Sequence, residues 1–184
     1  MKKRLLLITG SPGVGKTTLL LKVAEALKAK GINVGGMISR DVRTSGSRVG
    51  FEVTDLSSGN KGWLASVHQE RGPQVGKYRV DIDDLNDVGV KAILDACEKL
   101  DAVVVDEIGP MELFSEKFRE AVKKAVESKM LVVSAIHWKM GGELIDSIKK
   151  REDAEIHILT SENRDHVLEE IIREALDFLS KVDA

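Results

Sequence analysis

The sequence predicts an α/β fold with a mostly parallel sheet, and three observations support this prediction. Short β-branched runs alternate with longer amphipathic segments along the 184 residues, which is the pattern expected when helices cover a sheet. The run Ala102–Val105 is apolar throughout, as in a strand that is buried on both faces of a parallel sheet. Because no repeat, low-complexity tract or linker interrupts the alternation, we expect one domain over residues 1–184.

Eight segments have the length and composition of strands. They are Leu5–Thr9, Asn33–Ser39, Arg48–Leu56, Trp63–Val67, Tyr78–Val80, Ala102–Val105, Leu131–Ile136 and Ala154–Leu159. The polar residues 44–47, between the second and the third, predict a hairpin turn. Residues 33–80 are therefore expected to form an antiparallel hairpin insertion in an otherwise mostly parallel sheet.

Five amphipathic segments are expected to form helices. They are a segment that begins near Gly15 and stops at Gly31, a segment that begins at Asp87 as its N-cap, residues 116–127, residues 143–148 and residues 168–179. The last of them carries its apolar residues at helical spacing on one face. We expect it to pack on the sheet and cover it.

Composition limits the kinds of partner. Apolar residues make up 42% of the chain and charged residues 32%, a balance typical of a water-soluble globular protein. The net charge of −2 gives no general attraction for nucleic acid or an anionic membrane. The apolar run Leu5–Ile8 is too short for a signal peptide or a membrane span. The single Cys97 forms neither an internal disulfide nor a zinc site, as expected in a reducing cytoplasm.

The segment between the first strand and the first helix matches the phosphate-binding pattern G-x-x-x-x-G-K-[ST]. It consists of Gly10, Ser11, Pro12, Gly13, Val14, Gly15, Lys16 and Thr17, followed by Thr18 as an expected α-phosphate contact. Its glycines allow a tight turn that presents N–H groups to an anion, and the following helix adds its positive end. Lys16 is then expected to contact the β- and γ-phosphates, and the Thr17 hydroxyl to bind Mg²⁺.

A second candidate segment is an apolar strand that ends in two carboxylates. It consists of Ala102, Val103, Val104, Val105, Asp106, Glu107, Ile108 and Gly109. Such a pair alone usually begins a solvated loop, but beside a phosphate loop it lies where ligands bind in open α/β sheets. Asp106 is expected to hold Mg²⁺ through its hydration shell, and Glu107 to orient a water toward the γ-phosphate. Lys16 and Glu107 are thus the candidate catalytic residues, and Thr17 and Asp106 the candidate metal ligands.

Several other polar residues leave two interpretations open. His137 follows a strand and could sense the γ-phosphate, or it could be a loop histidine without a role. The cations Lys149–Arg151 could close over phosphates as a lid, or they could stabilise a helix C-terminus. The same choice between ligand contact and an ordinary surface, core or capping role applies to Arg40, Arg43, Arg48, Trp63, Tyr78 and Asn163–Asp165.

Five groups of residues, spread over nearly the whole chain, carry a resemblance to a known family. They are residues 10–18, Gly46–Phe51, Tyr78–Asp81, Asp106–Gly109 with Met111–Leu113, and Glu162–Asp165. In this order they resemble the small P-loop nucleoside-triphosphatases first described from thermophiles, whose relatives include a human cancer-related nucleoside-triphosphatase. The first group is shared by many unrelated proteins, whereas the hairpin and the run from Asp106 to Leu113 are much more particular.

The resemblance implies a three-layer, RecA-like domain in the cytoplasm that hydrolyses the terminal phosphate of ATP, GTP and other nucleoside triphosphates. It implies slow turnover and little base selectivity, with residues 10–17 and 102–109 as the nucleotide-binding segments. It also adds Arg48 and Arg164 to the candidate site residues. Pro110 stands where some relatives have a basic residue, which puts a phosphate contact from that position in doubt.

Two alternatives to hydrolysis stay open. A phosphotransferase to a nucleoside, nucleotide or other small hydroxyl substrate would use the hairpin region and Lys149–Arg151 as acceptor site and lid, although Glu107 favours hydrolysis. A nucleotide-controlled binding module would use turnover to time association with a protein partner that the sequence does not identify. Asp106–Gly109 matches the D-x-x-G pattern of switch GTPases, but Asn60-Lys61 lacks the Asp two positions later that reads guanine.

Overall fold

A nine-stranded sheet runs through the computed structural model, which describes residues 2–180. The strands lie in the order β5-β6-β4-β3-β2-β7-β8-β1-β9. Their bounds are β1 Leu5–Thr9, β2 Val34–Thr44, β3 Ser47–Asp55, β4 Lys61–Ser66, β5 Gln74–Val75, β6 Tyr78–Val80, β7 Ala102–Ile108, β8 Leu131–Ile136 and β9 Ala154–Ile158. Strands β2, β7, β8, β1 and β9 are parallel, and β3 to β6 extend the same sheet as antiparallel strands.

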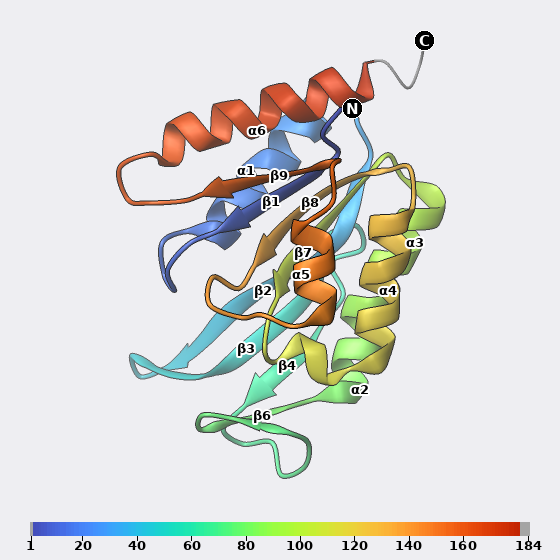
Figure 1. Ribbon diagram of the computed structural model, residues 1–184. Coiled ribbons are helices and arrows are strands. Elements are labelled where there is room, and N and C mark those ends of the chain that lie inside the picture. The colour runs from blue at the N-terminus through green and yellow to red at the C-terminus, as the bar shows by residue number, and fades with distance from the viewer. Residues whose placement is uncertain (1, 181–184) are drawn as a thin grey trace.

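Helices cover both faces of this sheet. Their bounds are α1 Lys16–Ala29, α2 Ile82–Asp84, α3 Lys91–Lys99, α4 Glu116–Glu127, α5 Glu143–Lys149 and α6 Arg164–Leu179, with the π-helical segment η1 Leu85–Val90 and the 3-10 turn η2 Glu112–Phe114. Helices α1 and α6 lie on one face, and α3, α4 and α5 on the other (Figure 1). The prediction of a three-layer α/β fold with an antiparallel hairpin region is confirmed. None of the helices in residues 2–180 is long and apolar enough to cross a membrane.

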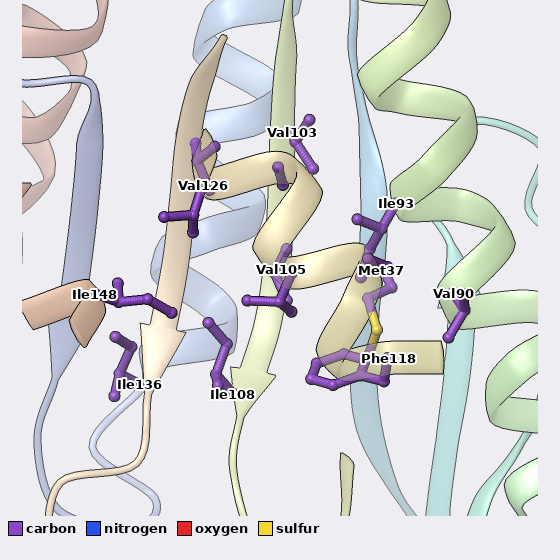
Figure 2. Packing of buried hydrophobic residues seen from close by; sticks show 14 of the residues in the cluster. Met37, Val90, Ile93, Val103, Val105, Ile108, Phe118, Val126, Ile136 and Ile148 are labelled. Atoms are coloured by element: carbon purple, nitrogen blue, oxygen red, sulfur yellow. The ribbon is translucent and has the colours of Figure 1, made fainter. Parts of the chain in front are cut away.

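The two-residue period of the strands divides the core between the two faces. On β1, Leu5 and Leu7 pack toward α3, α4 and α5, whereas Leu6 and Ile8 pack toward α1 and α6. The same alternation points Val103 and Val105 of β7 toward the face covered by α3, α4 and α5. Figure 2 shows both residues on the side of Phe118. Because β7 is apolar on both sides, it lies in the middle of the sheet, as expected of a doubly covered strand.

The helical region before β7 begins earlier than the sequence suggested. Asp81, and not Asp87, is the N-cap, since its carboxylate accepts a hydrogen bond of 2.9 Å from the N–H of Asp84. Asp87 lies inside η1, so its predicted capping role is wrong. The π-helical turn changes the spacing of apolar residues, and the 3.6-residue period becomes recognisable only beyond it.

One glycine allows a close approach between the two strands that carry the site. Gly36 on β2 has φ 112°, and a Cβ atom there would overlap the carbonyl oxygen of Val104 on β7. A glycine is therefore needed at this position both for its backbone conformation and for space. The resulting register places Met37 opposite Val105, and brings the next residues of β2 beside the carboxylates at the end of β7.

Candidate active site

The phosphate loop lies between β1 and α1, at the edge where the parallel strands end (Figure 1). Gly15 is the N-cap of α1 and has φ 106°, a left-handed conformation that favours glycine. Helix α1 therefore starts at Lys16, in agreement with the predicted start near Gly15. The loop residues 10–15 meet the N-terminal end of this helix, where backbone N–H groups attract anions.

Lys16 is folded over the loop. Its Nζ atom donates to the carbonyl oxygens of Gly10 at 2.9 Å and Ser11 at 3.3 Å. It also lies 3.8 Å from Oε2 of Glu107. Only 8% of Lys16 is exposed. Its ammonium group therefore lies buried between the phosphate loop and Glu107, one of the two carboxylates of β7.

Asp106 faces α1 because it continues the alternation that sends Val104 to that side of the sheet. Its Oδ2 atom accepts hydrogen bonds from the Thr17 hydroxyl at 2.7 Å and from the backbone N–H of Ser39 at 3.3 Å. Burial raises the pKa of Asp106 to about 6, although these two hydrogen bonds oppose the shift. The adjacent hydroxyl and carboxylate oxygens form a hard-oxygen donor set that fits Mg²⁺, which takes few protein ligands and keeps several waters.

Both carboxylates open into a cleft of about 720 Å³. Its walls come from the phosphate loop and α1, from strands β2, β3 and β4, and from the segments that follow β7 and β8. The lining residues include Pro12, Gly13, Gly15, Lys16, Thr17, Thr18, Asp106 and Glu107. The structure thus brings together the residues to which sequence analysis gave the phosphate, metal and water-orienting roles.

The remaining predicted residues of the two segments do not line this cleft. Ala102, Val103, Val104, Val105 and Ile108 are nearly fully buried in the core. Gly10 and Ser11 contribute backbone carbonyls to Lys16. These residues hold the loop and the carboxylates in position but do not themselves face the cleft.

A second cavity of about 340 Å³ lies on the α6 side of the phosphate loop. It shares Gly13, Gly15 and Thr18 with the cleft, and Arg164 and Leu168 from α6 also line it. The Arg164 Nε atom donates to the carbonyl oxygen of Val14 at 2.9 Å. The sequence alone left a capping turn open for Arg164, and the family resemblance made it a candidate site residue; the structure places its guanidinium against the loop.

The structure separates the other candidates into residues inside and outside the cleft. His137 lines the cleft, and its buried Nδ1 atom has no hydrogen-bond partner among residues 2–180. Its possible role as a γ-phosphate sensor stays a prediction. Arg151, in contrast, pairs with Asp153 at 2.8 Å. Because Asp153 also pairs with Arg4, this cation belongs to the start of β1 and β9, at the opposite edge of the sheet from the loop, so its lid role is wrong.

The aromatic and hairpin candidates divide in the same way. Trp63 is partly exposed on β4 and does not line the cleft, so it is neither a core residue nor placed to stack on a base there. Tyr78 packs edge-on against Phe51, with ring centroids 5.1 Å apart. Asn163 is the N-cap residue of α6, but its side chain makes no capping hydrogen bond: it accepts from the N–H of Thr160 and donates to the carbonyl oxygen of Ile158. Arg40 and Arg48 line the cleft, whereas Arg43 does not.

Glu112 is a cleft residue to which sequence analysis gave no role. It lies on η2 and is 5% exposed. Burial raises the pKa of its carboxyl group to about 8, and the negative charges of Glu107 and Asp106 add to the shift. The backbone N–H groups of Glu112 and Gly109 act in the opposite direction. The residue types Met-Glu-Leu do not predict that the glutamate is buried, because its burial depends on how the η2 turn folds back.

Glu112→Gln is expected to make the folded protein more stable at neutral and alkaline pH. A carboxyl group whose pKa is higher in the folded than in the unfolded state keeps a proton that the unfolded chain releases, so stability falls as pH rises between the two pKa values. For Glu112 this window runs from the ordinary pKa of 4.5 to the raised pKa of about 8. The amide carries no such proton, so the variant is expected to gain roughly 1–4 kcal/mol over wild type across that window.

Chemical denaturation at pH 5, 7 and 9 measures this effect, with the exposed Glu116→Gln as the control. The gain of Glu112→Gln should be smallest at pH 5 and largest at pH 9. An equal difference at all three pH values would show that Glu112 does not hold a proton in the folded protein.

Comparisons with known proteins show the family of this chain. Residues 5–172 match the model of a family described as NTPase. A nucleoside-triphosphatase THEP1 from Thermofilum pendens is 44% identical over 176 residues, covering 95% of this chain and 97% of that protein. A second THEP1, from Methanothermobacter thermautotrophicus, is 44% identical over 167 residues, covering 91% and 93%.

Two solved structures have the same fold. The crystal structure of THEP1 from the hyperthermophile Aquifex aeolicus superposes with a TM-score of 0.81 at 33% identity, covering 91% of this chain and 96% of that one. The solution structure of a human cancer-related nucleoside triphosphatase gives a TM-score of 0.79 at 35% identity, covering 92% and 96%. Both resemblances extend over nearly the whole chain, as does the family match. This chain therefore belongs to the NTPase family, together with the THEP1 nucleoside-triphosphatases.

Proposed function

We propose that this protein hydrolyses the terminal phosphate of ATP, GTP and other nucleoside triphosphates in a Mg²⁺-dependent reaction that is slow and has broad base specificity. The observation that carries the proposal is the convergence of Lys16, Thr17, Asp106 and Glu107 at one edge of the sheet, in a cleft of about 720 Å³. Family membership supports the same reaction class. The single Cys97 thiol supports a cytoplasmic location as part of the proposal.

Each of these side chains has a separate task in the proposed reaction. The phosphate loop binds the triphosphate with its backbone N–H groups, and Lys16 exchanges its loop carbonyls for phosphate oxygens. Thr17 and Asp106 would hold Mg²⁺, which supplies charge neutralisation on the β- and γ-phosphates when bound. Glu107 orients a water toward the γ-phosphorus and accepts its proton. The 3.8 Å ion pair between Glu107 and Lys16 keeps this carboxylate beside the cation that binds the phosphates.

Thr18 lines both the large cleft and the smaller cavity, and this indicates the direction in which a bound nucleotide lies. The γ-phosphate end is defined by Asp106 and Glu107 in the large cleft, so the α-phosphate and the nucleoside extend past Thr18 toward the smaller cavity. There the Arg164 guanidinium is a planar cation and Leu168 gives apolar surface. A guanidinium plane and an aliphatic side chain accept any base ring, which supports broad base specificity.

A phosphate-release assay with ATP, GTP, CTP and UTP tests this proposal. Each nucleotide should yield equal amounts of diphosphate and phosphate without any added acceptor. The rates for the four bases are expected to lie within about tenfold of one another, since the nucleoside contacts are non-directional. Absence of phosphate release from all four, by a folded protein that binds them, would contradict the proposal.

Removal of Mg²⁺ is expected to stop hydrolysis, and Asp106→Asn to raise the Mg²⁺ concentration needed for half-maximal rate by about 10-fold or more. The amide keeps the size of the side chain but loses the charge that attracts the hydrated ion. Titration of phosphate release with Mg²⁺, in wild type and variant, measures both effects. Undiminished activity in excess chelator would remove Thr17 and Asp106 from their assigned roles.

A further inference from the structure

The η2 turn brings a third carboxyl group to the cleft, beside the two at the end of β7. The backbone N–H of Leu113 donates to the carbonyl oxygen of Gly109 at 3.1 Å, so the chain folds back onto the end of the strand. This fold places Glu112 in the wall of the cleft that also contains Asp106 and Glu107. In the reaction proposed above, Asp106 holds the metal ion and Glu107 activates water, whereas Glu112 has no task.

Glu112 and Glu107 approach each other over Gly109. A Cβ atom at Gly109 would lie 3.1 Å from Oε1 of Glu107 and 3.2 Å from Oε2 of Glu112. The glycine therefore leaves open the space in which the two carboxyl groups converge. The other oxygen of Glu107, Oε2, lies 3.8 Å from Nζ of Lys16. The two oxygens of Glu107 thus have separate surroundings, with Oε2 beside the phosphate-binding cation and Oε1 on the side of Glu112.

Two carboxyl groups that converge in this way are expected to hold one proton between them, because like charges at short range cannot both form at low cost. Their surroundings decide which of them holds it. Glu112 is only 5% exposed, whereas the side chain of Glu107 is 23% exposed and has Lys16 as a partner. The negative charge is therefore more stable on Glu107 and the proton on Glu112. Burial, together with the charges of Glu107 and Asp106, raises the pKa of Glu112 to about 8, in agreement with this assignment.

The other charged groups around Glu112 do not take the place of this proton. In the part of the chain that the structure describes, Glu112 forms no ion pair. On α4, which packs against η2, Arg119 uses its Nε atom for the carbonyl oxygen of Leu113. The remaining titratable groups of the cleft wall come from α1, β2, β3 and the segment after β8, and they are Lys16, Arg40, Asp41, Arg48 and His137.

We propose that Glu112 is a positioning residue for hydrolysis, whose carboxylic acid donates a hydrogen bond to Oε1 of Glu107 and so holds Oε2 toward the attacking water. This rests on the proposed function, in which Glu107 activates the water. The water oxygen forms a bond to the γ-phosphorus and its proton passes to Oε2 of Glu107. The bond to the β–γ bridging oxygen breaks, and the diphosphate leaves with the electron pair. Glu112 keeps its own proton throughout, so it acts through Glu107 and does not contact the substrate.

Two substitutions of similar length separate this hydrogen bond from packing. Glu112→Gln keeps a donor, because its amide N–H can replace the acid O–H, whereas Glu112→Met has none. At pH 7, single-turnover phosphate release from Mg²⁺-ATP by Glu112→Gln should stay within about threefold of wild type. Release by Glu112→Met should be about 10- to 100-fold slower, as expected for loss of a hydrogen bond to a charged group. Neither change should alter the affinity for Mg²⁺-TP analogues of the substrate such as a non-hydrolysable Mg²⁺-nucleotide by more than about threefold.

A pH profile distinguishes a residue that donates a proton from one that only fills space. The wild-type rate should fall as the pH rises through about 8, the raised pKa of Glu112, because the acid then loses the proton with which it holds Glu107. Glu112→Gln should lack this fall, since its amide does not titrate. Infrared spectra of the nucleotide-free protein give a readout that is independent of activity. At pH 7, the wild type should show a C=O band of a protonated carboxylic acid that Glu112→Gln lacks.

The exposed Glu116→Gln is the matched control and should keep the rate, the pH profile and the infrared band of the wild type. Equal rates for Glu112→Gln and Glu112→Met, or a fall near pH 8 that persists in Glu112→Gln, would overturn this inference and leave the proposed hydrolysis standing. If Glu112→Met does not fold, the pH profiles of wild type and Glu112→Gln decide between the two outcomes. Absence of phosphate release by the folded wild type would refute the proposed function, and this inference with it.

Discussion

Lys16→Ala is expected to lower kcat for nucleoside triphosphate hydrolysis by about 10²- to 10³-fold, the loss typical of removing one donor that stabilises charge in the transition state. The Lys16 ammonium already lies between the loop carbonyls and Glu107. It is therefore placed to follow the charge that develops as the γ-phosphoryl group moves. Alanine leaves the backbone N–H groups of the loop in place, so part of the nucleotide affinity should remain.

The control for this variant is Lys30→Ala, which removes an exposed cation just beyond the other end of α1. Both variants should keep the circular dichroism spectrum of the wild type, since neither side chain supports the core. Single-turnover phosphate release then compares them directly. Turnover by Lys16→Ala that matches the control would mean that the loop does not bind the reacting phosphates.

The elements that could be predicted from the sequence are those whose local pattern and tertiary surroundings agree. Strands Leu5–Thr9 and Leu131–Ile136 have the predicted bounds because both are inner strands of the sheet and are buried on both faces. Helix Glu116–Glu127 is also as predicted. Ser115 caps it through a 3.0 Å hydrogen bond from the N–H of Phe118, which is a purely local signal.

Elements that depend on irregular backbone could not be placed in this way. The π-helical turn over Leu85–Val90 hides the true start of the helix at Asp81. The hairpin strand β2 runs on to Thr44, beyond its apolar part, because its outer residues pair with β3 and need no burial. Backbone pairing gives no signal in residue type when both sides of a strand face solvent.

The residues of the candidate site also divide into those that local sequence predicts and those that depend on the tertiary fold. The phosphate loop and the position of Asp106 follow from a motif and from strand alternation, both of which are local. Arg40, Glu112 and Trp138 reach the cleft only through the register of β2 with β7 and through the turns that follow β7 and β8. Their roles therefore depend on contacts between segments that lie tens of residues apart.

Glu107→Gln is expected to lower kcat for hydrolysis by about 10²- to 10⁴-fold, the usual contribution of general-base action. The substitution keeps the volume of the side chain, but the amide accepts no proton and orients the attacking water poorly. Asp106 and Thr17 would still hold the metal ion, and residues 10–17 would still bind the phosphates. The affinity for Mg²⁺-nucleotide should therefore change by less than about threefold.

The most direct test of this division of labour is a paired measurement on Glu107→Gln, wild type and the exposed control Glu116→Gln. Calorimetry gives the affinity for a Mg²⁺-nucleoside triphosphate, and single-turnover phosphate release gives the rate of the chemical step. Near wild-type affinity together with a rate about 10²- to 10⁴-fold lower is the predicted result. A rate within a few-fold of wild type, or a loss of affinity as large as the loss of rate, would contradict the assignment of Glu107 as the residue that activates water.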